Sequence, residues 1–546
     1  MRRLFGVETE YAVAALDDTG AVLPRGRLSE GMLRGAPKTF PALRATVEAG
    51  VFLGNGSRLY CDIGDHPELA GPECENPWDV VRYLRAGDRM LLRLTEDVRR
   101  RRPSIAQARV FAGNVDYAGT RSTWGAHESY CHRADPAVLR RRLVPHLVSR
   151  VIYAGAGGFN PYGPGLEFTL SPRSLHLRQV VSDSSTHERG IVHTRNQPLA
   201  AGGYRREHVL CGESLRSDLA AWLKVGVTAL VVAMIDGGVA CGDEVELEAP
   251  VEALHAFVKD VECRAGVPAR RGGAITAIGI QRRYLHHAQR CLDAPFMPSW
   301  AREACERWGE ILDRLEAGPD RVSRTLDWGI KLAMYRDRVE RRGFEWSELA
   351  GWSAPMAALE RARLARRRTS DDDPLVPETQ RPADAELWLK DATGGARARL
   401  KEFIALRHEL LEIDTRWALL GPGGVFDALD RAGVLDCGAG VDGIEEAVDQ
   451  PPSGSRARVR GMAIRRLSRA GERYSAGWDH VFDQETGRRL DLSDPFVQTE
   501  RWREPQPAPP PPPAPAVAPP EEELTPPRGA EGLWESVSRA LSRLGL

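Results

Sequence analysis

Paired cysteines, long apolar runs and an excess of one charge are all missing from this 546-residue sequence. Its nine cysteines are spread singly without a Cys-x-x-Cys pair, so neither a disulfide framework nor a zinc site is expected. The longest apolar run, Val225 to Ile235, is too short to cross a bilayer. The net charge of −1 gives no overall field that would attract nucleic acid or a membrane surface.

Lysine is also scarce, since six of the 75 basic residues are lysine and the other 69 are arginine. GC-rich coding is the simple explanation for this bias. The segment after Met1 has no apolar core long enough for a signal peptide. Together these absences predict a cytoplasmic protein with neither nucleic acid nor a membrane as partner.

Hydrophobic periodicity predicts a mixture of strands and helices. A strand is expected over residues 4–16, and Asn55-Gly56 is typical of a hairpin turn after a strand that begins at Val51. Residues 21–50 are expected to be irregular, because they are polar and contain glycine and proline. Further sheet is expected over 151–175 and 190–212, helices over 78–102, 219–235, 301–342 and 396–411, and a surface loop over 364–379.

The composition changes abruptly beyond Glu504. The proline tract over residues 505–520 predicts a semi-rigid linker. After it, apolar residues recur on one helical face, which predicts an amphipathic helix over 529–546. Such a helix on a tether docks either on a protein partner or on its own body, and the sequence leaves both open.

Acidic and polar side chains alternate along two predicted strands near the N-terminus. Glu8 and Glu10 are two residues apart and therefore project from one face of a strand. Tyr60 and Asp62 share a face in the same way, and Glu68 follows shortly after. Carboxylates gathered on one buried face are costly unless they bind a hard cation. Mg²⁺ prefers such oxygen ligands and commonly bridges to phosphates, so this pattern favours a magnesium site.

Repeated arginines could neutralise a transferring phosphoryl group, and several of them lie on segments that are expected to be strands. They are Arg58, Arg173, Arg195, Arg456, Arg458 and Arg460. The sequence has no Gly-x-x-x-x-Gly-Lys-Ser/Thr, which argues against an ordinary P-loop. A solvated strand face would explain any one of these pairs, but the whole set favours metal-dependent phosphoryl chemistry.

Several motifs are similar to one known family. They are Gly6-Val7-Glu8-Thr9-Glu10-Tyr11, Asp62-Ile63-Gly64-Asp65-His66-Pro67-Glu68, Gly125-Ala126-His127-Glu128-Ser129-Tyr130, His193-Thr194-Arg195, Tyr204-Arg205-Arg206-Glu207-His208 and Trp478-Asp479. In this order they resemble the family that contains the Pup–protein ligases (proteasome accessory factor A) and the Pup deamidase-depupylases. The resemblance extends over residues 2 to 500 and excludes the proline tract.

The resemblance implies an α+β fold of the glutamine synthetase and carboxylate–amine ligase class. An antiparallel sheet forms a cradle under helices, ATP and Mg²⁺ lie on it, and a small C-terminal domain closes one end. The implied division is a catalytic domain over 1–412, a C-terminal domain over 413–503, a proline-rich linker over 504–528 and the terminal helix over 529–546. The implied partners are a Pup-like modifier and lysine-bearing proteins, with a separate partner for the terminal helix left open.

The resemblance also implies roles for individual residues. Asp62 corresponds to the catalytic aspartate, which would act as the base that deprotonates the attacking lysine. The implied metal ligands are Glu8, Glu10, Tyr60, Glu68 and His208. The implied ATP contacts are Arg58, Arg195, Arg456 and Trp478.

Two sister activities share this site, and the sequence favours the ligase. The first motif is closer to the ligase form, and Asp62 precedes Glu68 by six residues, whereas deamidases are one residue shorter there. Deamidases also carry a long insertion after the first strand, for which the 34 residues between Leu16 and Val51 leave little room. A depupylase or deamidase, or a degenerate modifier-binding scaffold, remains the alternative.

The sequence departs from the family pattern at positions linked to substrate and nucleotide rather than to metal. An Asn-Asn-Thr-Asp motif is replaced by Gly113-Asn114-Val115-Asp116, and the residues after Arg195 are Asn196-Gln197-Pro198-Leu199. Gly71 stands where the family has a threonine, and Pro172 where it has a glutamine.

Overall fold

The computed structural model describes residues 2–117, 122–184, 188–195, 199–357, 359 and 394–505. The surface loop expected over 364–379, the terminal helix, residues Asn196 to Pro198 and the proline-rich linker beyond Pro505 lie outside the described residues. Residues 1–503 group into one compact unit. The boundary expected at residue 412 stays a prediction.

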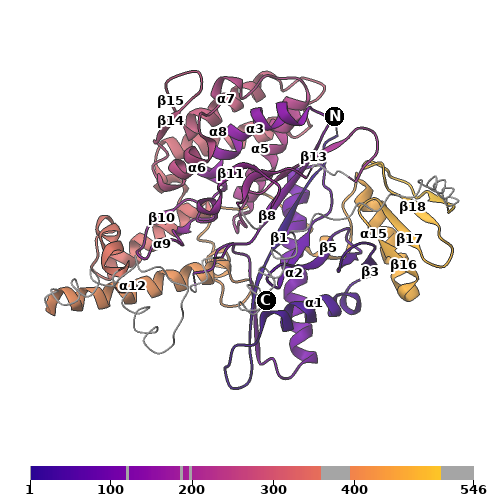
Figure 1. The fold of residues 1–546 in the computed structure, drawn as a ribbon, viewed down its shortest axis with the longest axis horizontal. Coiled ribbons are helices and arrows are strands. Elements are labelled where there is room, and N and C mark those ends of the chain that lie inside the picture. The colour runs from indigo at the N-terminus through magenta and orange to yellow at the C-terminus, as the bar shows by residue number, and fades with distance from the viewer. Residues whose placement is uncertain are drawn as a thin grey trace, which may run out of the picture. The chain divides into compact units, whose positions relative to one another are not determined.

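A 13-stranded sheet organises this unit (Figure 1). In spatial order its strands are β11 (Gln179–Ser182), β12 (Gly190–His193), β13 (Arg205–Val209), β8 (Ala126–His132), β1 (Phe5–Glu10), β6 (His66–Ala70), β5 (Arg58–Asp62), β4 (Val51–Leu53), β3 (Ala42–Ala45), β16 (Tyr474–Ala476), β17 (His480–Asp483), β18 (Arg489–Asp491) and β19 (Trp502–Arg503). The pairs β11–β12 and β3–β16 are parallel, and the other neighbours are antiparallel. This arrangement confirms the expected α+β class with a largely antiparallel sheet.

Within the described residues, three pairs of short strands lie outside the large sheet, and each strand is two to five residues long. They are β2 (Ala12–Leu16) with β7 (Gln107–Phe111), β9 (Gly158–Phe159) with β10 (Phe168–Thr169), and β14 (Gly266–Pro268) with β15 (Ala274–Thr276). The strand expected over residues 4–16 is therefore real but divides into β1 and β2. The hairpin expected at Asn55-Gly56 is confirmed by the antiparallel pairing of β4 and β5.

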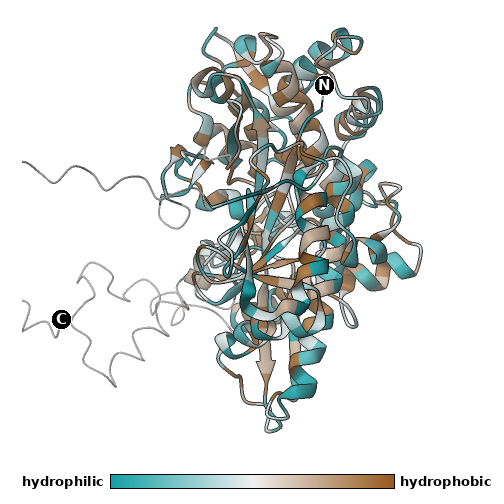
Figure 2. Cartoon of the chain, turned by 90° about the vertical axis from the view of Figure 1, so that its right-hand side faces the viewer, coloured by the Kyte–Doolittle hydropathy of each residue, from teal (hydrophilic) through white to brown (hydrophobic). Residues whose placement is uncertain are grey.

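Helices cover the sheet and carry most of the apolar core. Their bounds are α1 (Arg25–Thr39), α2 (Pro77–Arg101), α3 (Pro136–Ser149), α4 (Val151–Ala154), α5 (Asp218–Asp236), α6 (Pro250–Lys259), α7 (Ala277–Arg290), α8 (Ala301–Glu316), α9 (Asp327–Arg341), α12 (Gly394–Ala418), α13 (Val425–Arg431), α14 (Ile444–Asp449) and α15 (Arg456–Leu467). Helix α2 begins where the Asn76 side chain accepts a hydrogen bond from the Asp79 amide. Figure 2 shows hydrophilic and hydrophobic residues side by side on these helices, as amphipathic covering helices require.

Helix α5 is the centre of the core. It packs against α2, α3, α8 and strand β8, and every residue from Ala220 to Ile235 is buried. Among the described residues it is also the one helix long and apolar enough to cross a membrane, but 89% of that apolar window is buried inside the protein. Its uniform hydrophobicity is what a helix surrounded by other core elements needs.

Truncating this helix tests the packing directly. Leu223, in the middle of α5, is fully buried. We expect Leu223→Ala to lower the free energy of unfolding by about 2–5 kcal/mol, because it removes buried methyl groups and leaves a cavity. Thermal and denaturant unfolding measure the loss. Val22→Ala is the control, since Val22 is 78% exposed and its truncation should leave stability unchanged.

Four expectations about secondary structure were wrong. Residues 21–50 contain helix α1 and strand β3, because α1 accommodates Pro37 in its last turn. Residues 151–175 contain helix α4, two short strands and a 3₁₀ turn rather than sheet, and a short apolar run cannot distinguish these by periodicity. The helix expected over 301–342 is interrupted near Gly318, whose φ of +117° ends α8. Arg456, Arg458 and Arg460 lie on α15 and not on a strand.

Candidate active site

Acidic side chains meet on one face of the large sheet because of its register. Glu10 of β1 pairs with Glu68 of β6, and Glu68 pairs in turn with Tyr60 of β5. Residues directly opposite each other in antiparallel strands project from the same face. Glu8 and Asp62, two residues away along their strands, therefore share that face as well.

Glu10, Asp62 and Glu68 form an all-oxygen group, with carboxylate oxygens within 4.8 Å of one another. Burial and the nearby charges of Glu8 and Glu10 raise the pKa of Glu68 well above its usual range. Burial, together with the charge of Asp62, raises the pKa of Glu10 to about 7. Carboxylates crowded in this way are stabilised by a bound cation, so the residues fit Mg²⁺, which takes oxygen ligands.

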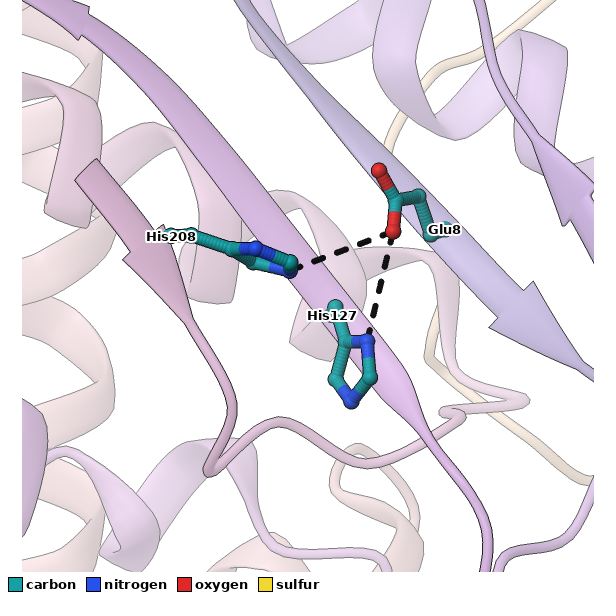
Figure 3. Close-up of side chains that lie close together, drawn as sticks. All are labelled: Glu8, His127 and His208. Carbon is teal, nitrogen blue, oxygen red and sulfur yellow. Dashed lines mark ion pairs between the residues drawn. The ribbon is translucent and has the colours of Figure 1, made fainter. Parts of the chain in front are cut away.

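A second group combines one carboxylate with two imidazoles (Figure 3). Oε2 of Glu8 lies 4.0 Å from Nδ1 of His127 and 3.9 Å from Nε2 of His208. Burial lowers the pKa of both histidines well below the usual range, so both rings are neutral near pH 7. The sequence places His127 in the Gly125–Tyr130 motif and predicts no role for it. Its position is fixed by the pairing of Glu8 with His127 across β1 and β8, which is a long-range register.

A cavity of about 110 Å³ lies beside Glu8, over the part of the sheet next to the acidic group. Its walls include Arg206, Arg456 and Trp478. The Trp478 ring packs edge-on against Phe52, and Arg456 forms an ion pair of 2.8 Å with Glu73. The structure therefore brings two of the predicted ATP contacts, Arg456 and Trp478, to a cavity that Glu8 also lines.

The other two predicted ATP contacts lie close by but outside the lining of that cavity. The Arg58 guanidinium stacks over the Tyr60 ring at 4.5 Å and forms an ion pair of 3.0 Å with Glu48. Arg195 is exposed, and its amide donates a hydrogen bond of 2.9 Å to Nδ1 of His193. The nucleotide roles of Arg58 and Arg195 stay predictions.

Three further arginines differ from the expectation that they face a phosphate. Arg173 is 1% exposed and donates to Thr123 and to backbone carbonyls, so it has a structural role. Arg460 is fully buried and pairs with Glu73. Arg458 points to solvent. The charge of Arg173 nevertheless acts on Glu10, whose pKa it lowers in opposition to burial.

A larger cavity of about 1120 Å³ lies beyond the other end of the acidic group. Ala12, two residues after Glu10, and Trp124 form part of its wall. The Trp124 ring stacks on His66 at 4.7 Å, and His66 pairs with Asp62 across β5 and β6. The acidic group therefore lies between a small cavity on one side and a large one on the other.

Comparison with known proteins gives one consistent result. The family model described as Pup-ligase protein matches residues 3–352 and 396–482. The chain is 30% identical over 515 residues to Pup–protein ligase 1 of Rhodococcus erythropolis, a match that covers 91% of this chain and 96% of the relative. It is 29% identical to the Pup–protein ligase of Mycobacterium tuberculosis, with the same coverage.

Solved structures agree with this result. The ligase PafA in complex with the prokaryotic ubiquitin-like protein Pup superposes with a TM-score of 0.70 at 25% identity, covering 91% of this chain and 90% of that one. PafA in complex with ADP superposes with a TM-score of 0.64 at 26% identity, covering 82% and 87%. The family model and the relatives span nearly the whole described chain, and the chain therefore belongs to the Pup-ligase protein family.

Proposed function

We propose that this chain is an ATP- and Mg²⁺-dependent ligase that joins the C-terminal glutamate of a Pup-like modifier to lysines of proteins. The observation that carries the proposal is the acidic group on the sheet, which lies beside a cavity lined by Arg456 and Trp478. Family membership supports the same activity, and the ADP complex of a relative supports ATP as the nucleotide.

Two steps of the reaction require help from the protein: phosphorylation of the carboxylate, where negative charge must be neutralised, and attack by the lysine amine, where a proton must be removed. When a carboxylate attacks the γ-phosphate of ATP, two negatively charged groups approach each other, and an Mg²⁺ ion held at the acidic group would supply the neutralising charge. Glu10 and Glu68 would hold this ion, with Glu8 and Tyr60 beside them. Arg58, Arg195 and Arg456 would bind and orient the phosphates by charge-assisted hydrogen bonds.

The glutamyl phosphate formed in this way must then be attacked by a lysine amine. A lysine ammonium has no free electron pair at neutral pH, so a base has to remove its proton. Asp62 would take this proton, since it lies on the acidic face next to Glu10 and beside the wall of the large cavity. We propose that the modifier's carboxyl group and the lysine approach from that cavity and the nucleotide from the small one.

The direct test incubates the purified chain with ATP, Mg²⁺, a Pup-like peptide ending in glutamate and a lysine-bearing protein. We expect ADP and an adduct whose mass equals the sum of the two proteins less one water. Release of ammonia from a peptide that ends in glutamine, or of modifier from a conjugate, without adduct formation would favour the deamidase-depupylase alternative. If neither an adduct nor released ammonia or modifier is formed, the result would favour a modifier-binding scaffold.

Glu68→Gln tests the metal dependence of this proposal. The substitution removes one of the three carboxylate charges, so we expect the Mg²⁺ concentration for half-maximal ADP formation to rise by about tenfold or more. A magnesium titration at saturating ATP measures it. Glu30→Gln, at an exposed position of α1, serves as the control. An unchanged magnesium dependence would remove Glu68 from the metal site.

We also propose a domain organisation and a cellular location. The chain has a catalytic domain over 1–412, a C-terminal domain over 413–503 and, beyond it, the proline-rich linker and the terminal helix, and it acts in the cytoplasm. The scarcity of lysine suits an enzyme that conjugates to lysine, because it offers few acceptors of its own.

A further inference from the structure

His66 lies directly opposite Asp62, where β6 pairs with β5. Residues paired in this way project from one face of the sheet with Cβ atoms about 5 Å apart. The imidazole of His66 and the carboxylate of the proposed base are therefore neighbours on the acidic face. The chemistry proposed above uses Asp62 but not His66, although the His66 side chain is almost completely buried beside it.

Two contacts hold the His66 ring in one orientation. Nδ1 lies 3.0 Å from the backbone oxygen of Tyr11. Because a carbonyl oxygen only accepts, Nδ1 donates and carries a ring proton. The ring also stacks on Trp124 at 4.7 Å, with 23° between the two planes. Trp124 is held in turn, since its backbone oxygen accepts a hydrogen bond of 2.7 Å from Arg173.

The opposite edge of the His66 ring faces the turn that follows Asp62. A Cβ atom built on Gly64, in the middle of this turn, would lie 3.3 Å from Cδ2 and 3.6 Å from Nε2 of His66. A histidine with the ordinary pKa of about 6.5 is mostly uncharged at pH 8. With the proton on Nδ1, the lone pair is on Nε2, so the edge nearest Asp62 presents a hydrogen-bond acceptor.

The acceptor lysine has more N–H groups than Asp62 can bind alone. An ammonium group has three donors, and a base removes one of its protons. We propose that Nε2 of His66 accepts a hydrogen bond from a second N–H of the acceptor lysine and so orients the amine for attack. Trp124, on which the ring stacks, also lines the large cavity from which the lysine is proposed to approach. This inference rests on the proposed function and names a further residue that binds its acceptor.

The role of His66 is to orient the amine, not to transfer a proton. Asp62 takes one proton from the ammonium, and the freed electron pair forms a bond to the acyl carbon of the glutamyl phosphate. The bond from that carbon to the phosphate oxygen then breaks, and the second surplus proton of the nitrogen leaves with the phosphate. The hydrogen bond to His66 fixes the direction of the electron pair. Orientation is important because a misplacement of about 1 Å can slow a reaction by about 10²-fold.

The experiment compares two nucleophiles with wild-type protein and with His66→Asn, under single-turnover conditions at pH 8. One is a lysine-bearing protein, measured as adduct, and the other is hydroxylamine, measured as glutamyl hydroxamate. Hydroxylamine is uncharged at this pH and traps an acyl phosphate without first losing a proton. Asparagine keeps an N–H donor for the Tyr11 oxygen but has no acceptor at the place of Nε2. We expect adduct formation to fall by about 10–100-fold and hydroxamate formation to stay unchanged.

Two further variants separate orientation of the amine from a structural role. His66→Gln places an amide oxygen near the position of Nε2 and should restore most of the rate with lysine. His255→Asn is the matched control, because His255 of α6 also bonds a backbone oxygen, that of Ser174 at 3.1 Å. It should leave the ratio of the two rates unchanged. If His66→Asn does not fold, His66→Phe, which keeps a ring on Trp124, carries the same expectation.

The ratio of the two rates decides the outcome. An equal loss with both nucleophiles would make His66 a structural residue, and an unchanged ratio in His66→Asn would leave it no part in binding the amine; either result overturns the proposal. Wild-type protein that forms neither adduct nor hydroxamate would instead overturn the ligase function itself. The two failures are therefore distinguishable.

Discussion

Asp62→Asn is expected to slow adduct formation by about 10²–10⁴-fold, the range by which a positioned general base accelerates a reaction. Asparagine has nearly the shape of aspartate but cannot accept the proton of the attacking lysine. Asp62 is partly exposed, so the substitution should not disturb the fold. The measurement is the rate of adduct formation under single-turnover conditions, with ADP formation followed in parallel.

The parallel measurement distinguishes a base from a metal ligand. If Asp62 acts mainly as the base, phosphorylation of the modifier's carboxylate should persist while transfer to lysine fails. A loss of both steps, reversed by more Mg²⁺, would assign Asp62 to the metal group with Glu10 and Glu68. Asp65→Asn is a matched control, because Asp65 is exposed in the adjoining turn and asparagine tolerates its φ of +63°. Full activity of Asp62→Asn would exclude both roles.

Glu73→Gln is expected to destabilise the protein by about 3–5 kcal/mol and to weaken nucleotide binding. Glu73 pairs with Arg456 at 2.8 Å and with Arg460, and both arginines are buried. Removing the carboxylate charge leaves two buried guanidiniums without their counter-ion. Since Arg456 also lines the small cavity, its position is lost as well. Thermal unfolding and ADP binding by calorimetry measure the two effects.

The pH dependence of this pair has a definite sign. Burial alone would raise the pKa of Glu73, but Arg460 and Arg456 lower it to about 2 from an ordinary 4.5. A carboxyl group with a lowered pKa in the folded state stabilises the protein fully above its unfolded value. This contribution should therefore be intact above about pH 4.5 and vanish toward pH 2. Glu75→Gln is the control, because its pair with Arg2 is exposed and should be worth at most about 1 kcal/mol.

The sequence was most informative where a local pattern determines geometry. Alternation along a strand is enough to place Glu8 and Glu10 on one face, and family motifs added Asp62 and Glu68 to the same face. Uniform hydrophobicity predicted α5 correctly, because a core helix needs no polar side. The fold class followed from the family resemblance rather than from periodicity.

The sequence was least informative where long-range register or packing decides. His127 meets Glu8 only because β8 pairs with β1, and no local pattern contains that pairing. The arginines of residues 456–460 alternate as in a strand, yet they form α15, whose Ser455 cap accepts from the Ala457 amide. From the sequence Arg173 resembles a phosphate ligand, but its guanidinium donates hydrogen bonds to backbone carbonyls.

The walls of the small cavity come from opposite ends of the chain, and this has a consequence for synthesis. Glu8 is made among the first residues, whereas Arg456 and Trp478 follow more than 400 residues later. At a translation rate of roughly 5–20 residues per second, the ribosome needs roughly 20–90 seconds to deliver them. A nascent chain therefore lacks the complete nucleotide site that we propose, and we expect the enzyme to become competent to consume ATP only as its synthesis nears completion.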